Sequence, residues 1–86
     1  MKHILVIEDD LLIRNEIVIL LEKAGYQVDE INDFKDTTQQ AMKYDVDLIL
    51  LDLNLPGESG FQICKNLKAK ESIPILILTS RDRLSD

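Results

Sequence analysis

The 86 residues of this chain, with a mass of 9.9 kDa, predict a single domain, because folded domains typically contain about 100–150 residues. A hydrophobic share of 45% and a charged share of 30% are typical of a globular protein and exclude a disordered or fibrous one. The 16 acidic and 10 basic residues give a formal net charge of −6, which repels phosphate backbones, so we expect no direct nucleic-acid binding by this chain.

The first element in the sequence is a short apolar run from His3 to Ile7. A continuous apolar run of this length favours a strand that is buried on both faces of a parallel sheet. The run ends abruptly in three acidic residues, Glu8, Asp9 and Asp10.

A helix is predicted over residues 11–24, where the apolar period changes from continuous to helical. Asp9 or Asp10 can cap its start, and Gly25 suits its end. The apolar residues expected on its buried face are Ile13, Ile17, Leu20, Leu21 and Ala24.

The middle of the chain repeats the same alternation of strand and helix. A weaker strand is predicted from Tyr26 to Ile31, and a helix from Lys35 to Tyr44. A second fully apolar run, Leu48 to Leu51, again ends in a carboxylate, Asp52.

Pro56, Gly57 and Gly60 indicate a loop before the third helix, which is predicted from Gly60 to Lys70. Its predicted core residues are Phe61, Cys64 and Leu67. We interpret the single cysteine as core packing and not as a metal or redox site. A last apolar run, Ile75 to Leu78, ends in Thr79 and Ser80.

Three strand–helix units followed by a fourth strand predict an α/β fold with parallel strands and helices on both faces. The carboxyl ends of parallel strands share one edge of the sheet, which is where ligands bind in such folds. We therefore expect Glu8, Asp9, Asp10, Asp52 and Thr79 to lie close together at that edge.

Clustered carboxylates repel one another unless a cation lies among them, and Mg²⁺ prefers carboxylate, water and phosphate oxygens. An ionised Asp52 in this setting can attack phosphorus, and the Thr79 hydroxyl can donate a hydrogen bond to a phosphoryl oxygen. Simpler interpretations stay open: Asp10 suits a helix cap better than a ligand, and Thr79 equally suits an ordinary strand residue. His3 is expected at the opposite end of its strand.

Three motifs, at residues 4–10, 50–57 and 74–81, resemble the receiver domain of two-component response regulators. They occur in the family's order and near its spacings, and the resemblance extends over the whole chain. The resemblance implies a flavodoxin-like doubly wound parallel sheet, truncated in this chain to four strands in the order 2-1-3-4 with three helices.

The resemblance also implies a role for each site residue. Asp52 corresponds to the phosphoacceptor, Asp9 to the direct Mg²⁺ ligand and Glu8 to its acidic partner. The main-chain carbonyl of Asn54 corresponds to a further ligand, and Thr79 to the switch hydroxyl. The implied partner is a sensor histidine kinase that supplies the phosphoryl group.

The family's receiver continues through a fourth helix, a fifth strand that ends in a lysine, and a fifth helix. We therefore expect residues 1–86 to be the N-terminal part of a receiver domain, truncated before these elements and lacking an output domain. The motif ending in Arg81 is similar to regulators with a winged-helix DNA-binding domain. Uncovered apolar surface then predicts a homodimer or larger self-association.

The leading interpretation is a signalling module for transcription regulation and not an enzyme. A second hypothesis is a haloacid-dehalogenase-like phosphatase, which usually has a second Asp two residues after its nucleophile. Asn54 occupies that position here, so the general acid of that class is missing. A protein-interaction domain that is not phosphorylated stays open as an alternative. No apolar run reaches the roughly 18–20 residues of a membrane span, and no secretory signal is present, so we expect a cytoplasmic protein without a membrane partner.

Overall fold

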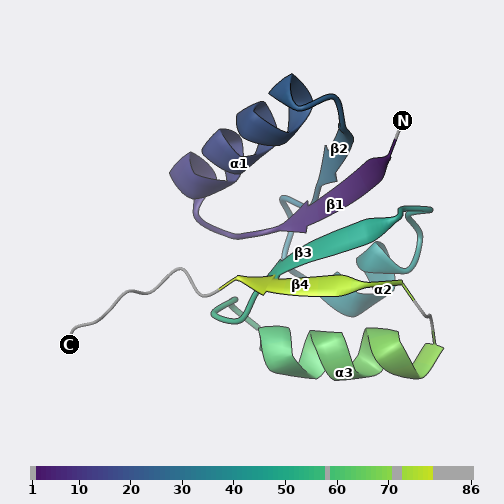
Figure 1. Ribbon diagram of the computed structural model, residues 1–86. Helices are drawn as coiled ribbons and strands as arrows, with labels where there is room; N and C mark the ends of the chain where they lie inside the picture. The colour runs from purple at the N-terminus through teal and green to yellow at the C-terminus, as the bar shows by residue number, and fades with distance from the viewer. Residues whose placement is uncertain (1, 58, 71–72, 79–86) are drawn as a thin grey trace.

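The computed structural model describes residues 2–57, 59–70 and 73–78, and these form the predicted alternation of strands and helices (Figure 1). The four strands form one parallel sheet in the order β2-β1-β3-β4. The elements are β1 (His3–Ile7), α1 (Leu11–Lys23), β2 (Gln27–Glu30), α2 (Thr37–Ala41), β3 (Leu48–Asp52), α3 (Gly60–Lys70) and β4 (Ile75–Leu78). The predicted α/β fold and strand order are confirmed.

The sheet lies between two helical layers, with α1 on one face and α2 and α3 on the other (Figure 1). Alternate residues of β1 and β3 contribute to opposite cores, as expected for strands buried on both faces. On the α1 face the buried residues are Ile4, Val6 and Leu50. On the other face they are Leu5, Ile7, Ile31, Ala41, Val46, Ile49, Leu51, Ile63 and Leu67.

Helix α1 has a well-defined cap at each end. Asp10 is the N-cap, and its Oδ1 accepts hydrogen bonds from the main-chain N–H groups of Leu12 and Ile13. At the C-terminus Gly25 adopts a left-handed conformation with φ of 98°, and Tyr26 N–H donates to the Leu21 carbonyl. These bonds fix where α1 starts and where the chain turns into β2.

The predicted packing face of α1 is partly wrong. Ile13, Leu20 and Ala24 are exposed, and the apolar residues that pack against the sheet are Ile17, Val18 and Leu21. Arg14 lies on the same face, three and four residues before the first two of these, and is buried. The face is therefore rotated relative to the prediction, because a charged side chain occupies one of its inward positions.

Two further expectations need correction on the opposite side of the sheet. Helix α2 contains only Thr37–Ala41, shorter than the predicted range 35–44, and Asp36, which has a left-handed conformation with φ of 50°, accounts for its later start. In α3, Phe61 is 73% exposed although it was expected in the core. The buried apolar side chains described for that helix are Ile63 and Leu67, and Cys64 packs beside them half-buried.

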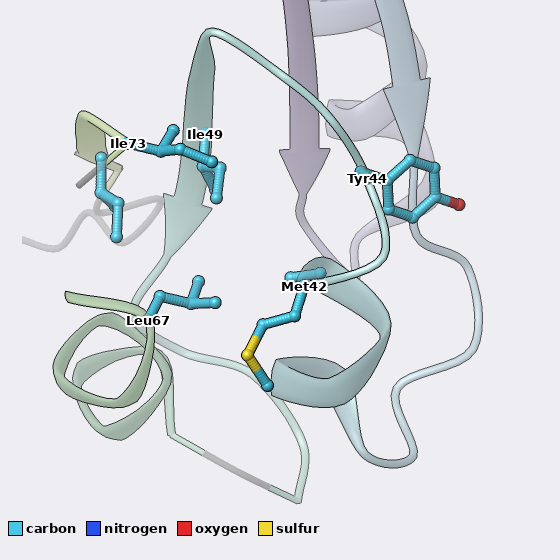
Figure 2. A pocket seen from close by; sticks show the side chains of 7 residues that line it. Met42, Tyr44, Ile49, Leu67 and Ile73 are labelled. Atoms are coloured by element: carbon cyan, nitrogen blue, oxygen red, sulfur yellow. The ribbon is translucent and has the colours of Figure 1, made fainter. Parts of the chain in front are cut away.

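A small apolar cavity of about 10 Å³ lies beneath the sheet, between β3, β4 and the two helices of this face (Figure 2). Its lining includes Met42, Ile49, Leu67 and Ile73. A space of this size and lining holds no more than one water molecule and offers that water few polar partners.

Among the described helices, none combines the length and apolar character that a membrane crossing requires.

Candidate functional site

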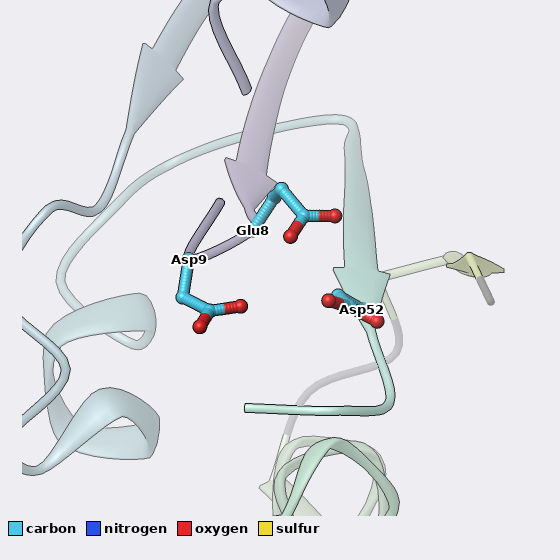
Figure 3. Close-up of side chains that lie close together, drawn as sticks. All are labelled: Glu8, Asp9 and Asp52. Carbon is cyan, nitrogen blue, oxygen red and sulfur yellow. The ribbon is translucent and has the colours of Figure 1, made fainter. Parts of the chain in front are cut away.

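Three carboxylates converge at the carboxyl edge of the sheet. Glu8 and Asp9 follow the last residue of β1, and Asp52 is the last residue of β3. The register pairs Ile7 with Leu51, so Glu8 and Asp52 emerge side by side. One oxygen of each carboxylate lies within 4.8 Å of the others, and Figure 3 shows all three directed into a common space.

The Glu8 side chain is buried at this edge, with 1% of its surface exposed. Burial raises the pKa of Glu8 to about 7, and the neighbouring charges of Asp52 and Asp9 act in the same direction. The main-chain N–H of Asp10 donates to Glu8 Oε2 at 3.1 Å and partly opposes this rise. The other oxygen, Oε1, accepts no hydrogen bond from any described residue.

Asp52 is equally buried, and the turn that follows it is tightly built. Its Oδ1 accepts a hydrogen bond from the main-chain N–H of Asn54 at 3.1 Å. The N–H of Gly60, the first residue of α3, donates to the Leu53 carbonyl at 3.0 Å. A Cβ atom at Gly60 would lie 2.1 Å from the Asp52 carbonyl oxygen, so only glycine permits this approach of α3 to the end of β3.

The donor set fits a hard divalent cation. Three carboxylates of the described chain supply oxygen ligands within a short distance of one another, and Asp9 is exposed to solvent while Glu8 and Asp52 are buried. Mg²⁺ binds such sites through one or two carboxylates and retains waters that phosphoryl oxygens can replace. The orphaned Glu8 oxygen and the raised pKa of this side chain both indicate a site that gains from a positive charge.

The remaining predicted residues have different positions. Asp10 caps α1 and does not belong to the carboxylate cluster. His3 lies at the other end of β1, where its ring contacts the Asp29 carboxylate of β2. The carbonyl ligand expected at Asn54 stays a prediction, and Thr79 lies outside the described residues.

Arg14 was missed by the sequence analysis, although it touches the site. Its Nη1 donates to the main-chain oxygen of Glu8 at 3.1 Å. A signal was present in the sequence, because Arg14 is spaced three, four and seven residues before the apolar Ile17, Val18 and Leu21. When a helix follows an acidic strand end, a basic residue on its apolar face indicates that this residue has a buried hydrogen-bond acceptor.

The sequence pattern of the family described as response regulator receiver domain matches residues 4–86. The chain is similar to the aerobic respiration control protein ArcA of Escherichia coli, with 36% identity over 84 residues. This similarity covers 98% of the chain and 35% of ArcA. The chain thus spans about a third of the length of the curated relatives that it matches.

Solved structures show the same likeness in three dimensions. The response regulator TrrA of Thermotoga maritima, in complex with Mg²⁺ and BeF, superimposes with a TM-score of 0.85 at 29% identity, covering 95% of this chain and 72% of that one. TrrA bound to the histidine kinase ThkA superimposes with a TM-score of 0.79 at 28% identity, covering 100% of this chain and 75% of that one.

Proposed function

The chain belongs to the response regulator receiver domain family, and we propose that Asp52 accepts a phosphoryl group in a two-component signalling pathway. The observation that carries the proposal is the convergence of the Glu8, Asp9 and Asp52 carboxylates at the carboxyl edge of the sheet. Asp52 is the buried member that ends a strand, and its surroundings hold it in one orientation through the Asn54 N–H.

The proposed reaction is a single displacement at phosphorus. A carboxylate oxygen of Asp52 attacks the phosphorus of a phosphohistidine, an O–P bond forms, and the N–P bond breaks. The imidazole leaves with the electron pair of that bond and takes a proton from solvent. The product is an aspartyl phosphate, an acyl phosphate that water hydrolyses to restore the carboxylate.

We assign a Mg²⁺ site to Glu8, Asp9 and Asp52, with the Asn54 carbonyl as a further predicted ligand. When bound, the ion supplies positive charge that offsets the negative charge of the phosphoryl oxygens. Glu8 and Asp9 contribute carboxylate oxygens beside Asp52. The burial of Asp52 limits the access of water to the nucleophile. Thr79 is the predicted switch hydroxyl.

The proposed upstream partner is a sensor histidine kinase, and the TrrA complex with ThkA supports it. Because the chain spans about a third of its curated relatives, a DNA-binding output domain is proposed and lies outside these residues. The expected cytoplasmic location and self-association also stay predictions.

Intact-mass spectrometry after incubation with acetyl phosphate and Mg²⁺ tests the proposal. We expect one added phosphoryl group on the wild-type chain and none on Asp52→Asn. Asp10→Asn is the matched control, because asparagine is an equally good N-cap, and it should retain labelling. Labelling that persists in Asp52→Asn would reject Asp52 as the acceptor, and an unlabelled wild type would favour a protein-interaction domain.

A further inference from the structure

The guanidinium group of Arg14, on α1, forms hydrogen bonds with residues at the carboxyl ends of β1 and β2, near the acidic site. Its Nε donates to Glu30 Oε1 at the end of β2 at 2.8 Å. Its Nη1 donates to the main-chain oxygens of Glu8, directly after β1, and Ile31, directly after β2, at 3.1 and 3.3 Å. The Arg14 residue is only 7% exposed, and its two bonds to main-chain oxygens are buried, whereas the bond to Glu30, whose side chain is 36% exposed, is partly buried.

One of these acceptors belongs to the carboxylate cluster itself. Arg14 holds the main-chain oxygen of Glu8, while Glu8 Oε2 accepts from the N–H of Asp10. Asp10 is in turn fixed as the N-cap of α1, the helix that carries Arg14. The segment from Glu8 to Asp10 is therefore held from both ends by α1, and the positions of the Glu8 and Asp9 carboxylates depend on these bonds.

We propose that Arg14 is a positioning residue for the acidic site, oriented by Glu30. It holds the main chain of Glu8 so that the carboxylates of Glu8 and Asp9 face Asp52. Outer residues of this kind typically change metal affinity about 10–100-fold when they are replaced. The consequence for metal binding rests on the proposed function, whereas the consequence for the Glu8–Asp10 segment does not.

The sign of the effect on Mg²⁺ binding separates positioning from other roles. The positive charge of Arg14 repels a cation, so by charge alone its removal strengthens Mg²⁺ binding. A purely structural role lowers stability and leaves the affinity of the folded protein unchanged. Only loss of positioning weakens Mg²⁺ binding.

The experiment measures Mg²⁺ dissociation constants of the full chain by isothermal titration calorimetry, below the melting temperature of each variant. Arg14→Met keeps most of the side-chain packing, and we expect binding roughly 10-fold weaker than in the wild type. Arg14→Lys keeps the charge but has one nitrogen for three acceptors, so we expect a smaller loss. Lys23→Met removes a charge from the exposed end of the same helix and should leave the affinity unchanged.

A second measurement does not need the metal. Hydrogen exchange of the Asp10 amide, which donates to Glu8, should be faster in Arg14→Met than in Lys23→Met. If Arg14→Met does not fold, Arg14→Lys and Glu30→Ala provide the same two readouts. Arg14→Lys leaves fewer hydrogen bonds to the three acceptors, and Glu30→Ala removes the carboxylate that orients the Arg14 guanidinium.

Mg²⁺ binding that is equal or tighter in a folded Arg14 variant, together with unchanged exchange at Asp10, would overturn the proposal. A wild type that binds Mg²⁺ but is not phosphorylated rejects the proposed function and leaves this inference standing. A wild type that binds no Mg²⁺ rejects the metal assignment, and exchange at Asp10 then decides whether Arg14 positions the segment.

Discussion

The side chains of Glu8 and Asp52 lie next to each other at the ends of two paired strands, and each is only 1% exposed. Two carboxylates buried this close are difficult to ionise together, so one of them retains its proton to a higher pH. Burial raises the pKa of Glu8 to about 7, and the neighbouring Asp52 acts in the same direction. At the proposed Mg²⁺ site, proton binding and metal binding are therefore expected to compete for the Glu8 carboxylate.

The first prediction concerns stability without metal. Glu8 binds its proton more tightly in the folded chain than in the unfolded one, so its contribution to the free energy of unfolding falls as pH rises from about 4.5 to about 7. Between these two pH values, the decrease in the free energy of unfolding that Glu8 causes approaches about 1.4 kcal/mol per pH unit. Urea denaturation in EDTA between pH 5 and 8 measures it.

The control for this slope is Glu8→Gln, which keeps the size and polarity of the side chain but does not titrate. Its stability should lose the part of the pH dependence that Glu8 causes. An identical slope in wild type and Glu8→Gln would assign the dependence to other carboxylates.

The second prediction concerns Mg²⁺ affinity. A ligating carboxylate must lose its proton, so the apparent affinity should fall about 10-fold per pH unit below the pKa of Glu8 and level off above it. Calorimetric titrations at pH 6, 7 and 8 test this dependence. The curve of Asp10→Asn should match the wild type, and a flat wild-type curve would exclude Glu8 from the site.

The convergence of the three carboxylates could be predicted from the sequence, because parallel strands place their carboxyl ends at one edge. The apolar runs before Glu8 and Asp52 each fix one strand end, and the strand order that the resemblance implies makes the two strands neighbours. The roles of Asn54 and Thr79 came from the resemblance alone, and they stay predictions.

The orientation of the helices could not be predicted as well. A charged residue in an amphipathic pattern usually faces solvent, yet Arg14 is buried because three oxygens accept from its guanidinium. Phe61 was expected inside by its hydrophobicity, but Ile63 and Leu67 already fill that face of α3. Tertiary partners decide these cases, and the local sequence does not contain them.

The third prediction concerns self-association. An apolar groove of about 350 Å³ on the α1 face of the sheet is lined by residues that include Leu21, Leu50 and Leu76, and Leu76 is 55% exposed. Exposed apolar surface of this kind favours association between copies. Sedimentation velocity should show oligomers that increase with concentration.

Leu76→Lys should weaken this association by about 10-fold or more, because burying a leucine side chain contributes about 1.5–3 kcal/mol. Leu12→Lys is the control, since Leu12 is 77% exposed on α1 but does not line the groove. A wild type that is monomeric at every concentration would show the prediction to be wrong.

The fourth prediction concerns Gly60, which allows α3 to begin directly against the end of β3. In Gly60→Ala the new Cβ would lie 2.1 Å from the Asp52 carbonyl oxygen and 2.5 Å from Leu53 Cα, and both are main-chain atoms that cannot rotate away. Either α3 or the turn after Asp52 must move. We expect a loss of about 3 kcal/mol in the free energy of unfolding, at the upper end of typical overpacking costs, and weaker Mg²⁺ binding.

Gly25→Ala separates this steric effect from backbone strain. Gly25 has φ of 98°, and a Cβ there would meet no atom within 4 Å, so its substitution should cost only the roughly 1–2 kcal/mol of a left-handed conformation. It lies at the C-terminal end of α1, remote from the carboxylates, so Mg²⁺ affinity should not change. Because the two substitutions add the same methyl group, urea denaturation and calorimetry of the pair isolate the close approach at Asp52. Equal stability losses and equal Mg²⁺ affinities in the two variants would show that the turn after Asp52 accommodates the methyl group, and that the contact with Gly60 does not shape the site.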